Sequence, residues 1–232
     1  MEFMLLFMFP PGAPTPTSDA MAEMGRFVGD LRTRGKLRRG APLATDREGS
    51  RVRKRDGKAL VVDGPFAESK EVVAGFWIVD VADRAEAVDV ATRCPHSEDH
   101  LVEVHAVDTR HLYADSERGV PYLLAFLVEP GFEDCGGARL RAMLAHADGL
   151  AAEGQLLETT PLAATPPPAR VTRKGGKTLV VDGPFAETKE VVGGYSLVRA
   201  ADRAAAIALA CDYPHAQWGT VEVREILFFD RT

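Results

Sequence analysis

The sequence is poor in cysteine, with only three cysteines, which are scattered at positions 94, 135 and 211. An odd and scattered set does not make the even framework of a small, disulfide-stapled secreted protein. It is typical of a chain that is kept in a reducing compartment. We therefore expect a cytoplasmic protein without a disulfide or metal framework built on these thiols.

The chain also lacks an excess of positive charge and any long apolar run. Its net charge is −6 and its pI is about 5.6. Because affinity for phosphate backbones rests on clustered lysine and arginine, this balance argues against direct nucleic-acid binding. No run approaches the ~18 apolar residues of a membrane span, so no membrane association is expected. Local basic runs at 32–39 and 51–55 fit solvated faces, with an anionic partner as the alternative.

What the chain does contain is an internal repeat. The stretch Val61–Val73 returns as Val180–Val192, at an offset of 182 − 63 = 119 residues. The same offset aligns the rest of both copies without a gap, and repeats decide the domain organisation of a chain. We predict two copies of one domain, in residues 1–110 and 120–232, joined by a linker at 111–119.

Each copy shows the same order of predicted elements. The apolar run at the N-terminus recurs inside the chain at 122–127, so we expect a buried strand there rather than a signal peptide. The order strand, helix, strand, hairpin, strand, helix, strand indicates a ferredoxin-like α+β fold with helices on one face of an antiparallel sheet. Because the other sheet face must also be covered, we expect the two sheets to pack together as an intramolecular pseudo-dimer.

The repeated signature Asp-Gly-Pro-Phe-Ala-Glu-Ser/Thr-Lys-Glu has two interpretations. A structural turn explains its first four residues, from Asp63 to Phe66. A turn does not explain the charges that both copies retain. The alternative is a ligand or catalytic site in which Asp63 and Asp182 act as general bases or orient a substrate. The candidate ligand-binding residues are Glu68, Lys70, Glu71 and His96 in the first copy, and Glu187, Lys189, Glu190 and His215 in the second.

This signature, with a Met-Leu-Leu-like first strand before it and Val-Glu-Val after it, resembles the YCII-related family in its DGPF-domain branch. The resemblance covers essentially the whole chain, twice, and implies a dimeric α+β barrel. Members are largely uncharacterised; some are encoded beside extracytoplasmic-function sigma factors, which suggests a role in transcription. Others carry a His–Asp pair proposed as an active site. Here only His146 and Asp212 would form such a pair, because the first copy has Phe27 and Arg93 instead.

Three functions therefore stay open. The chain binds a small polar molecule, or catalyses a reaction, at a pocket around the Asp-Gly-Pro-Phe turns; or it is a non-catalytic regulatory partner linked to a sigma factor; or it is a purely structural module. No cofactor is expected, because no glycine-rich phosphate loop is present. No metal is expected at 96–100, because the second copy lacks those residue types. The chain is either a monomer, as a pseudo-dimer, or a higher homo-oligomer.

Overall fold

The computed structural model describes residues 1–14, 16–95, 100–107, 109–115, 117–129, 137–163, 166–183, 185 and 189–228. The first repeat forms β1 (Glu2–Phe9), α1 (Ser18–Thr33), β2 (Leu37–Pro42), the 3-10 helix η1 (Asp46–Glu48), β3 (Ser50–Arg55), β4 (Lys58–Asp63), β5 (Val72–Asp80), α2 (Arg84–Arg93) and β6 (Leu101–Ala106). The linker holds β7 (His111–Leu112). The second repeat forms β8 (Val120–Val128), α3 (Ala138–Ala152), β9 (Leu156–Pro161), β10 (Ala169–Lys174), β11 (Lys177–Asp182), β12 (Val191–Ala200), α4 (Arg203–Asp212), the 3-10 helix η3 (Pro214–Gln217) and β13 (Thr220–Glu225).

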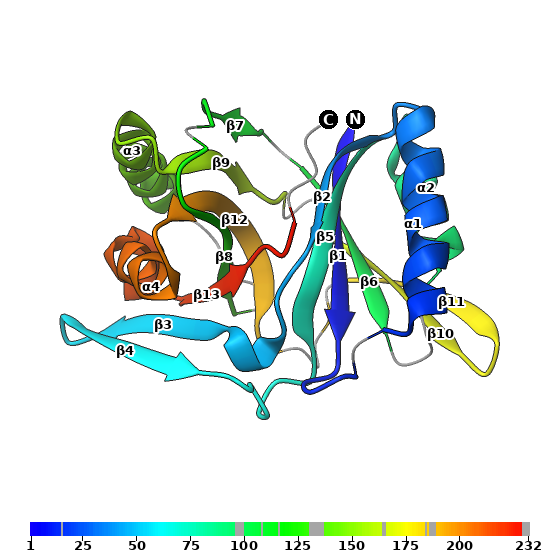
Figure 1. Cartoon of the computed structure of the whole chain (residues 1–232), viewed down its shortest axis with the longest axis horizontal. Coiled ribbons are helices and arrows are strands. Elements are labelled where there is room, and N and C mark those ends of the chain that lie inside the picture. Colours follow the sequence, from blue (N-terminus) through cyan, green and yellow to red (C-terminus); the bar gives the residue numbers. More distant parts are fainter. Residues whose placement is uncertain are drawn as a thin grey trace.

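The order of elements confirms the order predicted from the sequence, in both repeats. The strands form two antiparallel sheets that face each other, with α1 and α2 outside one sheet and α3 and α4 outside the other (Figure 1). The fold is therefore α+β, with two ferredoxin-like repeats packed together, as expected. Among the described residues, no helix combines the length and apolar character needed to cross a bilayer.

The two repeats exchange their hairpins. One sheet has the order β11-β10-β6-β1-β5-β2 and the other has the order β4-β3-β13-β8-β12-β9-β7. The hairpin β3–β4 of the first repeat therefore pairs with β13 of the second, with Val52 opposite Val221. In the same way, β10–β11 of the second repeat pairs with β6 of the first, with Val171 opposite Val102. Each sheet is thus built from both copies of the sequence.

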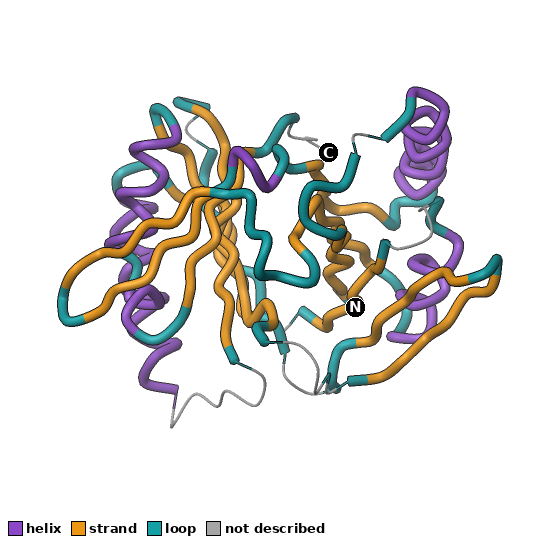
Figure 2. The backbone as a smooth tube through the Cα atoms, turned by 90° about the horizontal axis from the view of Figure 1, so that it is seen from below, coloured by secondary structure: helices purple, strands orange, loops and turns teal. Residues whose placement is uncertain are grey.

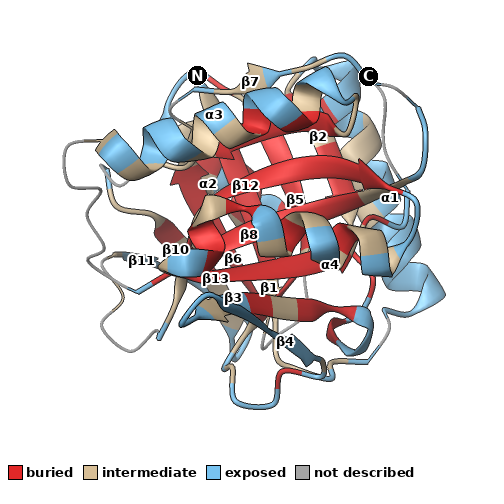
Figure 3. Cartoon of the chain, turned by 90° about the vertical axis from the view of Figure 1, so that its left-hand side faces the viewer, coloured by how far each residue is buried: buried red, intermediate tan, exposed pale blue. Residues whose placement is uncertain are grey.

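The packing places one core between the sheets and one under each pair of helices. The middle core holds Leu6, Phe76, Leu123 and Leu197, contributed by both repeats. The sheets also meet at their margins, where single β-bridges join Leu43 to Ile226 and Val107 to Leu162. Most of both sheets is buried, whereas β4 is exposed along its whole length (Figure 3). The two sheets therefore enclose a core of side chains from both repeats.

Local sequence signals explain where the outer helices and the hairpins begin. Asp83 and Asp202 cap α2 and α4, because their side chains accept hydrogen bonds from the backbone of Glu86 and Ala205 at 2.9 and 2.8 Å. Asp56 and Gly57 both have positive φ, of 52° and 75°. This is the geometry of a two-residue type I′ turn, for which Asp-Gly is a favoured sequence, and it closes the hairpin that the order of elements predicted.

The linker does more than connect the repeats. Its strand β7 extends the edge of the second sheet by pairing with β9. Just before it, the Arg110 guanidinium donates to both oxygens of the fully buried Glu158, at 2.8 and 2.9 Å. A third bond, of 2.9 Å, reaches Glu2 of the first repeat. Arg110 therefore ties β1 of one repeat to β9 of the other.

Candidate functional site

The first signature stretch turns sharply as it leaves β4. A Cβ on Gly64 would lie 1.7 Å from the carbonyl oxygen of Asp46 in η1, so only glycine fits there. The Gly64 amide donates to the Gly49 carbonyl at 3.1 Å, and the Ser69 amide donates to the Phe66 carbonyl at 2.9 Å. The turn is thus packed directly against η1, and it buries the Phe66 ring.

Phe66 covers an arginine that joins the two repeats. The Arg51 guanidinium lies 4.3 Å from the centroid of the Phe66 ring. It donates to the buried carboxylate of Glu222 at 2.9 and 2.8 Å, and to the Ser69 hydroxyl at 2.7 Å. Glu190 of the second signature lies 3.9 Å from the same guanidinium. Residues of both signatures therefore converge on Arg51.

The other half of the molecule contains a counterpart of this cluster. Arg170 stacks on Phe185, with its guanidinium 4.0 Å from the ring centroid, and donates to Glu103 at 2.6 Å. Where the first cluster has Arg224, this one has His105, 2.9 Å from Glu103. Burial raises the pKa of Glu103, but the hydrogen bond of His105 and the charge of Arg170 outweigh it and hold the pKa below its ordinary value.

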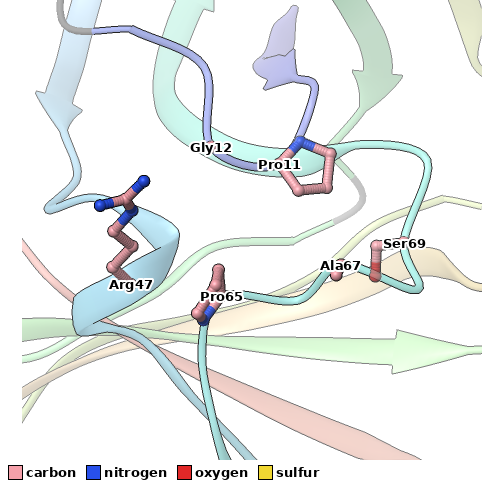
Figure 4. Close-up of a pocket in the computed structure, with 6 residues that line it drawn as sticks. All are labelled: Pro11, Gly12, Arg47, Pro65, Ala67 and Ser69. Atoms are coloured by element: carbon pink, nitrogen blue, oxygen red, sulfur yellow. The ribbon is translucent and has the colours of Figure 1, made fainter.

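A shallow pocket of about 290 Å³ lies beside the first signature turn (Figure 4). One wall is the signature itself and another is the turn after β1, while Arg47 rises from η1 across from them. The lining residues are Pro11, Gly12, Arg47, Pro65, Ala67 and Ser69. Behind Gly12 lies Asp46, a buried carboxylate that accepts from the Gly12 amide at 3.4 Å. The lining therefore offers a ligand one guanidinium and one hydroxyl.

The signature aspartates lie outside this lining. Asp63 accepts from the Ser50 hydroxyl at 2.9 Å and from Arg203 of the other repeat. Asp182 pairs with Arg84 in the same way across the molecule. The hydrogen bond of Ser50 and then the charge of Arg203 lower the pKa of Asp63. Both carboxylates are nearly two-thirds exposed, at 63% and 64%. The structure thus places them in ion pairs between the repeats.

The other predicted ligand-binding residues are not gathered in one place. Glu68, Lys70 and Lys189 are exposed, and Glu71 is half-buried. Glu190 accepts from the Thr220 hydroxyl at 2.8 Å, beside Arg51. The remaining two, His96 and Glu187, lie outside the described residues.

His215 is a packed histidine rather than a residue at the edge of the pocket. It is 4% exposed, and its Nε2 donates to the Leu127 carbonyl at 2.9 Å. A Cβ on Gly219 would lie 2.3 Å from this nitrogen, so glycine makes room for the ring. Burial lowers the pKa of His215, and the bond to Leu127 opposes that shift only in part.

The structure does not form a hydrogen-bonded dyad from His146 and Asp212. The His146 ring packs edge-on against Tyr213, with centroids 4.6 Å apart, and its buried Nε2 has no hydrogen-bond partner. Burial lowers the pKa of His146, against the opposing charge of Asp212. Beneath it, hydrogen bonds of 2.7 Å link the Tyr213 hydroxyl to Ser196, and Ser196 to Thr159. Trp77 and Gly40 occupy the equivalent positions of Ser196 and Thr159 in the first repeat, so this hydroxyl chain belongs to the second repeat alone.

Sequence reasoning missed Arg47 and the turn at Pro11 and Gly12. Proline followed by glycine is typical of a turn, but nothing local indicates that this turn meets the signature, more than fifty residues away in the chain. One signal for Arg47 was present in the sequence, because the two copies differ at this position: the equivalent residue of the second copy, 47 + 119 = 166, is proline. Groups of three or more His, Cys, Asp or Glu side chains suited to a metal ion are absent from the described part of the chain.

Comparison with known proteins agrees with this architecture. The family model of the YCII-related domain matches the chain twice, over residues 1–109 and 122–230. The chain is also similar to the uncharacterized protein R00369 of Rhizobium meliloti (strain 1021), with 42% identity over 57 residues. That match covers 25% of this chain and 46% of the relative, so it spans less than half the length of either protein.

Proposed function

Because the chain belongs to the YCII-related family and contains its domain twice, we propose that it binds a small polar molecule in the pocket beside the first Asp-Gly-Pro-Phe turn. The observation that supports this proposal is that the signature supplies one wall of the pocket and faces the exposed guanidinium of Arg47. A pocket of about 290 Å³ is close to the lower end of ligand sites, which are typically about 300–1,000 Å³.

The lining chemistry favours a ligand with an anionic group. Arg47 makes no ion pair or hydrogen bond with any other described residue, so its donors are available to a carboxylate or a phosphate. Ser69 adds a hydroxyl, which is oriented by Arg51. In this proposal the contacts come from Arg47 and Ser69, while Asp63 and Asp182 hold the repeats together. The lining offers no acid–base pair, which favours binding over catalysis.

Ligand-observed NMR with inorganic phosphate, citrate and glutamate as probes tests this proposal. We expect at least one probe to bind the wild-type protein and to lose binding in Arg47→Gln. The matched control is Arg34→Gln, which removes an exposed arginine on the C-cap of α1. The proposal is wrong if no probe binds, or if both variants weaken binding equally.

A second candidate is a non-catalytic regulatory role, in which the protein contacts a transcription component such as an extracytoplasmic-function sigma factor. The observation that favours it is that the charges of Asp63 and Asp182 are exposed and paired rather than directed into the pocket. Co-purification of the protein with the sigma factor encoded nearest to it is the direct test. A complex would support this candidate, and independent elution of the two proteins would count against it.

A further inference from the structure

The outermost strands of the exchanged hairpins are exposed aliphatic edges. All six residues of β4 and all six of β11 are exposed, and each strand ends its sheet. Leu60, Val61 and Val62 are 50%, 45% and 60% exposed. Their counterparts Leu179, Val180 and Val181 are 47%, 48% and 56% exposed. The two hairpins project from opposite sides of the molecule (Figure 2).

Both repeats have kept this exposed stretch identical. Leu60-Val61-Val62-Asp63 matches Leu179-Val180-Val181-Asp182 without a difference. Buried positions of β5 and β12 have diverged: Phe76 is matched by Tyr195, and Trp77 by Ser196. Proteins normally protect such edges with charges or coverings, because an exposed edge invites another strand. Since the two repeats have otherwise diverged, their identical aliphatic edges indicate a surface that binds another strand.

The hairpin geometry defines which groups face outward. Next to a two-residue type I′ turn, the flanking pair Arg55 and Lys58 exchanges backbone hydrogen bonds, and bonded pairs then alternate along the ladder. The backbone amides and carbonyls of Lys58, Leu60 and Val62 thus form hydrogen bonds with β3. The amides and carbonyls of Ala59, Val61 and Asp63 point away from it, ready to pair with an added strand.

The charge of the hairpin tips selects the kind of strand. Residues 53–58 contain four basic and one acidic side chain, 4 − 1 = +3, and residues 172–177 contain three basic ones, +3. The rest of the chain carries −6 − 6 = −12. Parallel edge pairing of two copies of the chain would place two +3 tips side by side, and this repulsion disfavours a second copy in that orientation.

We propose that β4 and β11 each accept an extended, acidic and aliphatic segment of another protein as an additional strand. The aliphatic side chains of the segment pack on Leu60 and Val62, or on Leu179 and Val181, while its acidic side chains lie near the basic tips. The exchanged hairpins already add strands in this way within the molecule, so the partner continues the same sheets outward. The inference goes beyond both candidate functions, because it requires neither a ligand in the pocket nor a transcription component.

The test measures binding of a fluorescein-labelled heptapeptide, with valines in its central part and glutamates at both ends, by fluorescence anisotropy. The double variant Val61→Pro/Val180→Pro removes one outward amide from each edge without breaking the bonds to β3 or β10. We expect it to bind about tenfold more weakly than wild type, as the loss of a backbone hydrogen bond predicts. The control Val61→Thr/Val180→Thr keeps both amides and is expected to bind like wild type.

A second variant keeps the proposal testable if the proline variant does not fold. Lys58→Glu/Lys177→Glu is expected to weaken binding of the glutamate peptide and to strengthen binding of an otherwise identical lysine peptide. Equal binding of the two peptides to wild type would overturn the acidic occupant. Undiminished binding to a folded proline variant would overturn edge pairing. Self-association in sedimentation velocity that the proline variant abolishes would show that a second copy is the occupant instead.

Discussion

The Arg51 guanidinium lies over the Phe66 ring, 4.3 Å from its centroid, and donates a hydrogen bond to Glu222 of the opposite repeat. Arg170 and Phe185 repeat this relationship at 4.0 Å in the other half. The phenylalanine of the signature thus shields an ion pair between the repeats from water. A shielded pair is stronger than an exposed one, because the local dielectric constant is lower.

Loss of this shield is expected to be costly. Phe66→Ala leaves a space beside Arg51 and exposes the Arg51–Glu222 pair, so we expect the free energy of unfolding to fall by about 3 kcal/mol. Urea denaturation followed by circular dichroism measures this change. Phe228→Ala is the control, because Phe228 is 67% exposed, and its expected effect is below about 0.5 kcal/mol. Equal effects of the two substitutions would show that the stacking of Phe66 on Arg51 does not contribute to stability.

Removal of the buried carboxylate is expected to be more damaging than removal of a surface one. Glu222→Gln leaves the buried Arg224 without its anionic partner and Arg51 with only Glu190, 3.9 Å away, so we expect a loss of about 3–5 kcal/mol. Asp89→Asn breaks the exposed i,i+4 pair with Arg93, where we expect about 0.3–0.5 kcal/mol. Denaturant titration of both variants at the same pH compares their free energies of unfolding with that of wild type. Similar losses would mean that Glu222 is solvated in solution.

Two glycines are expected to respond to alanine in opposite directions. In Gly40→Ala the new Cβ would lie 2.5 Å from Cδ1 of Trp77, a buried ring that cannot move freely, so we expect a loss of about 1–3 kcal/mol. Gly25 lies in α1, and a Cβ added to it would meet no other atom within 4 Å, so Gly25→Ala is expected to stabilise by about 0.5–1 kcal/mol. Thermal unfolding of both variants tests the opposite signs.

Stability is expected to fall as the pH drops through the histidine range. The folded-state pKa of His215 is below its ordinary value of 6.5, because burial disfavours the imidazolium. Between the folded-state and the unfolded-state pKa of His215, the unfolded chain binds more protons than the folded protein. The stability that neutral His215 contributes is therefore complete above pH 6.5 and is lost as the pH falls toward the folded-state pKa. His146 acts with the same sign.

Denaturant titrations at about pH 7.5 and about pH 5.5 measure this dependence. His215→Gln is expected to flatten the change between the two pH values, leaving the contribution of His146. His111→Gln, on the short strand β7, serves as the matched control and is expected to leave the slope as in wild type. A slope that His215→Gln does not alter would contradict the assignment.

Much of the fold followed from the sequence alone because it rests on local patterns. Valines alternate with polar residues along β6, and in the structure Val102 and Val104 lie under the helices while Glu103 and His105 lie on the other face. The Asp56-Gly57 turn and the caps at Asp83 and Asp202 also depend on local sequence. The offset of 119 residues carried each prediction from one repeat to the other.

The sites between the repeats were decided only by the tertiary structure. Backbone pairing along a sheet edge is nearly independent of side-chain identity, so nothing in Val52 specifies that it meets Val221 of the other repeat rather than a strand of its own. Once the hairpins exchange, Asp63 meets Arg203, which is 140 residues away, and Pro11 and Arg47 come to face the signature turn. The sequence therefore determined the elements and their buried faces. The exchange of hairpins decided which charged groups became partners and where a pocket formed.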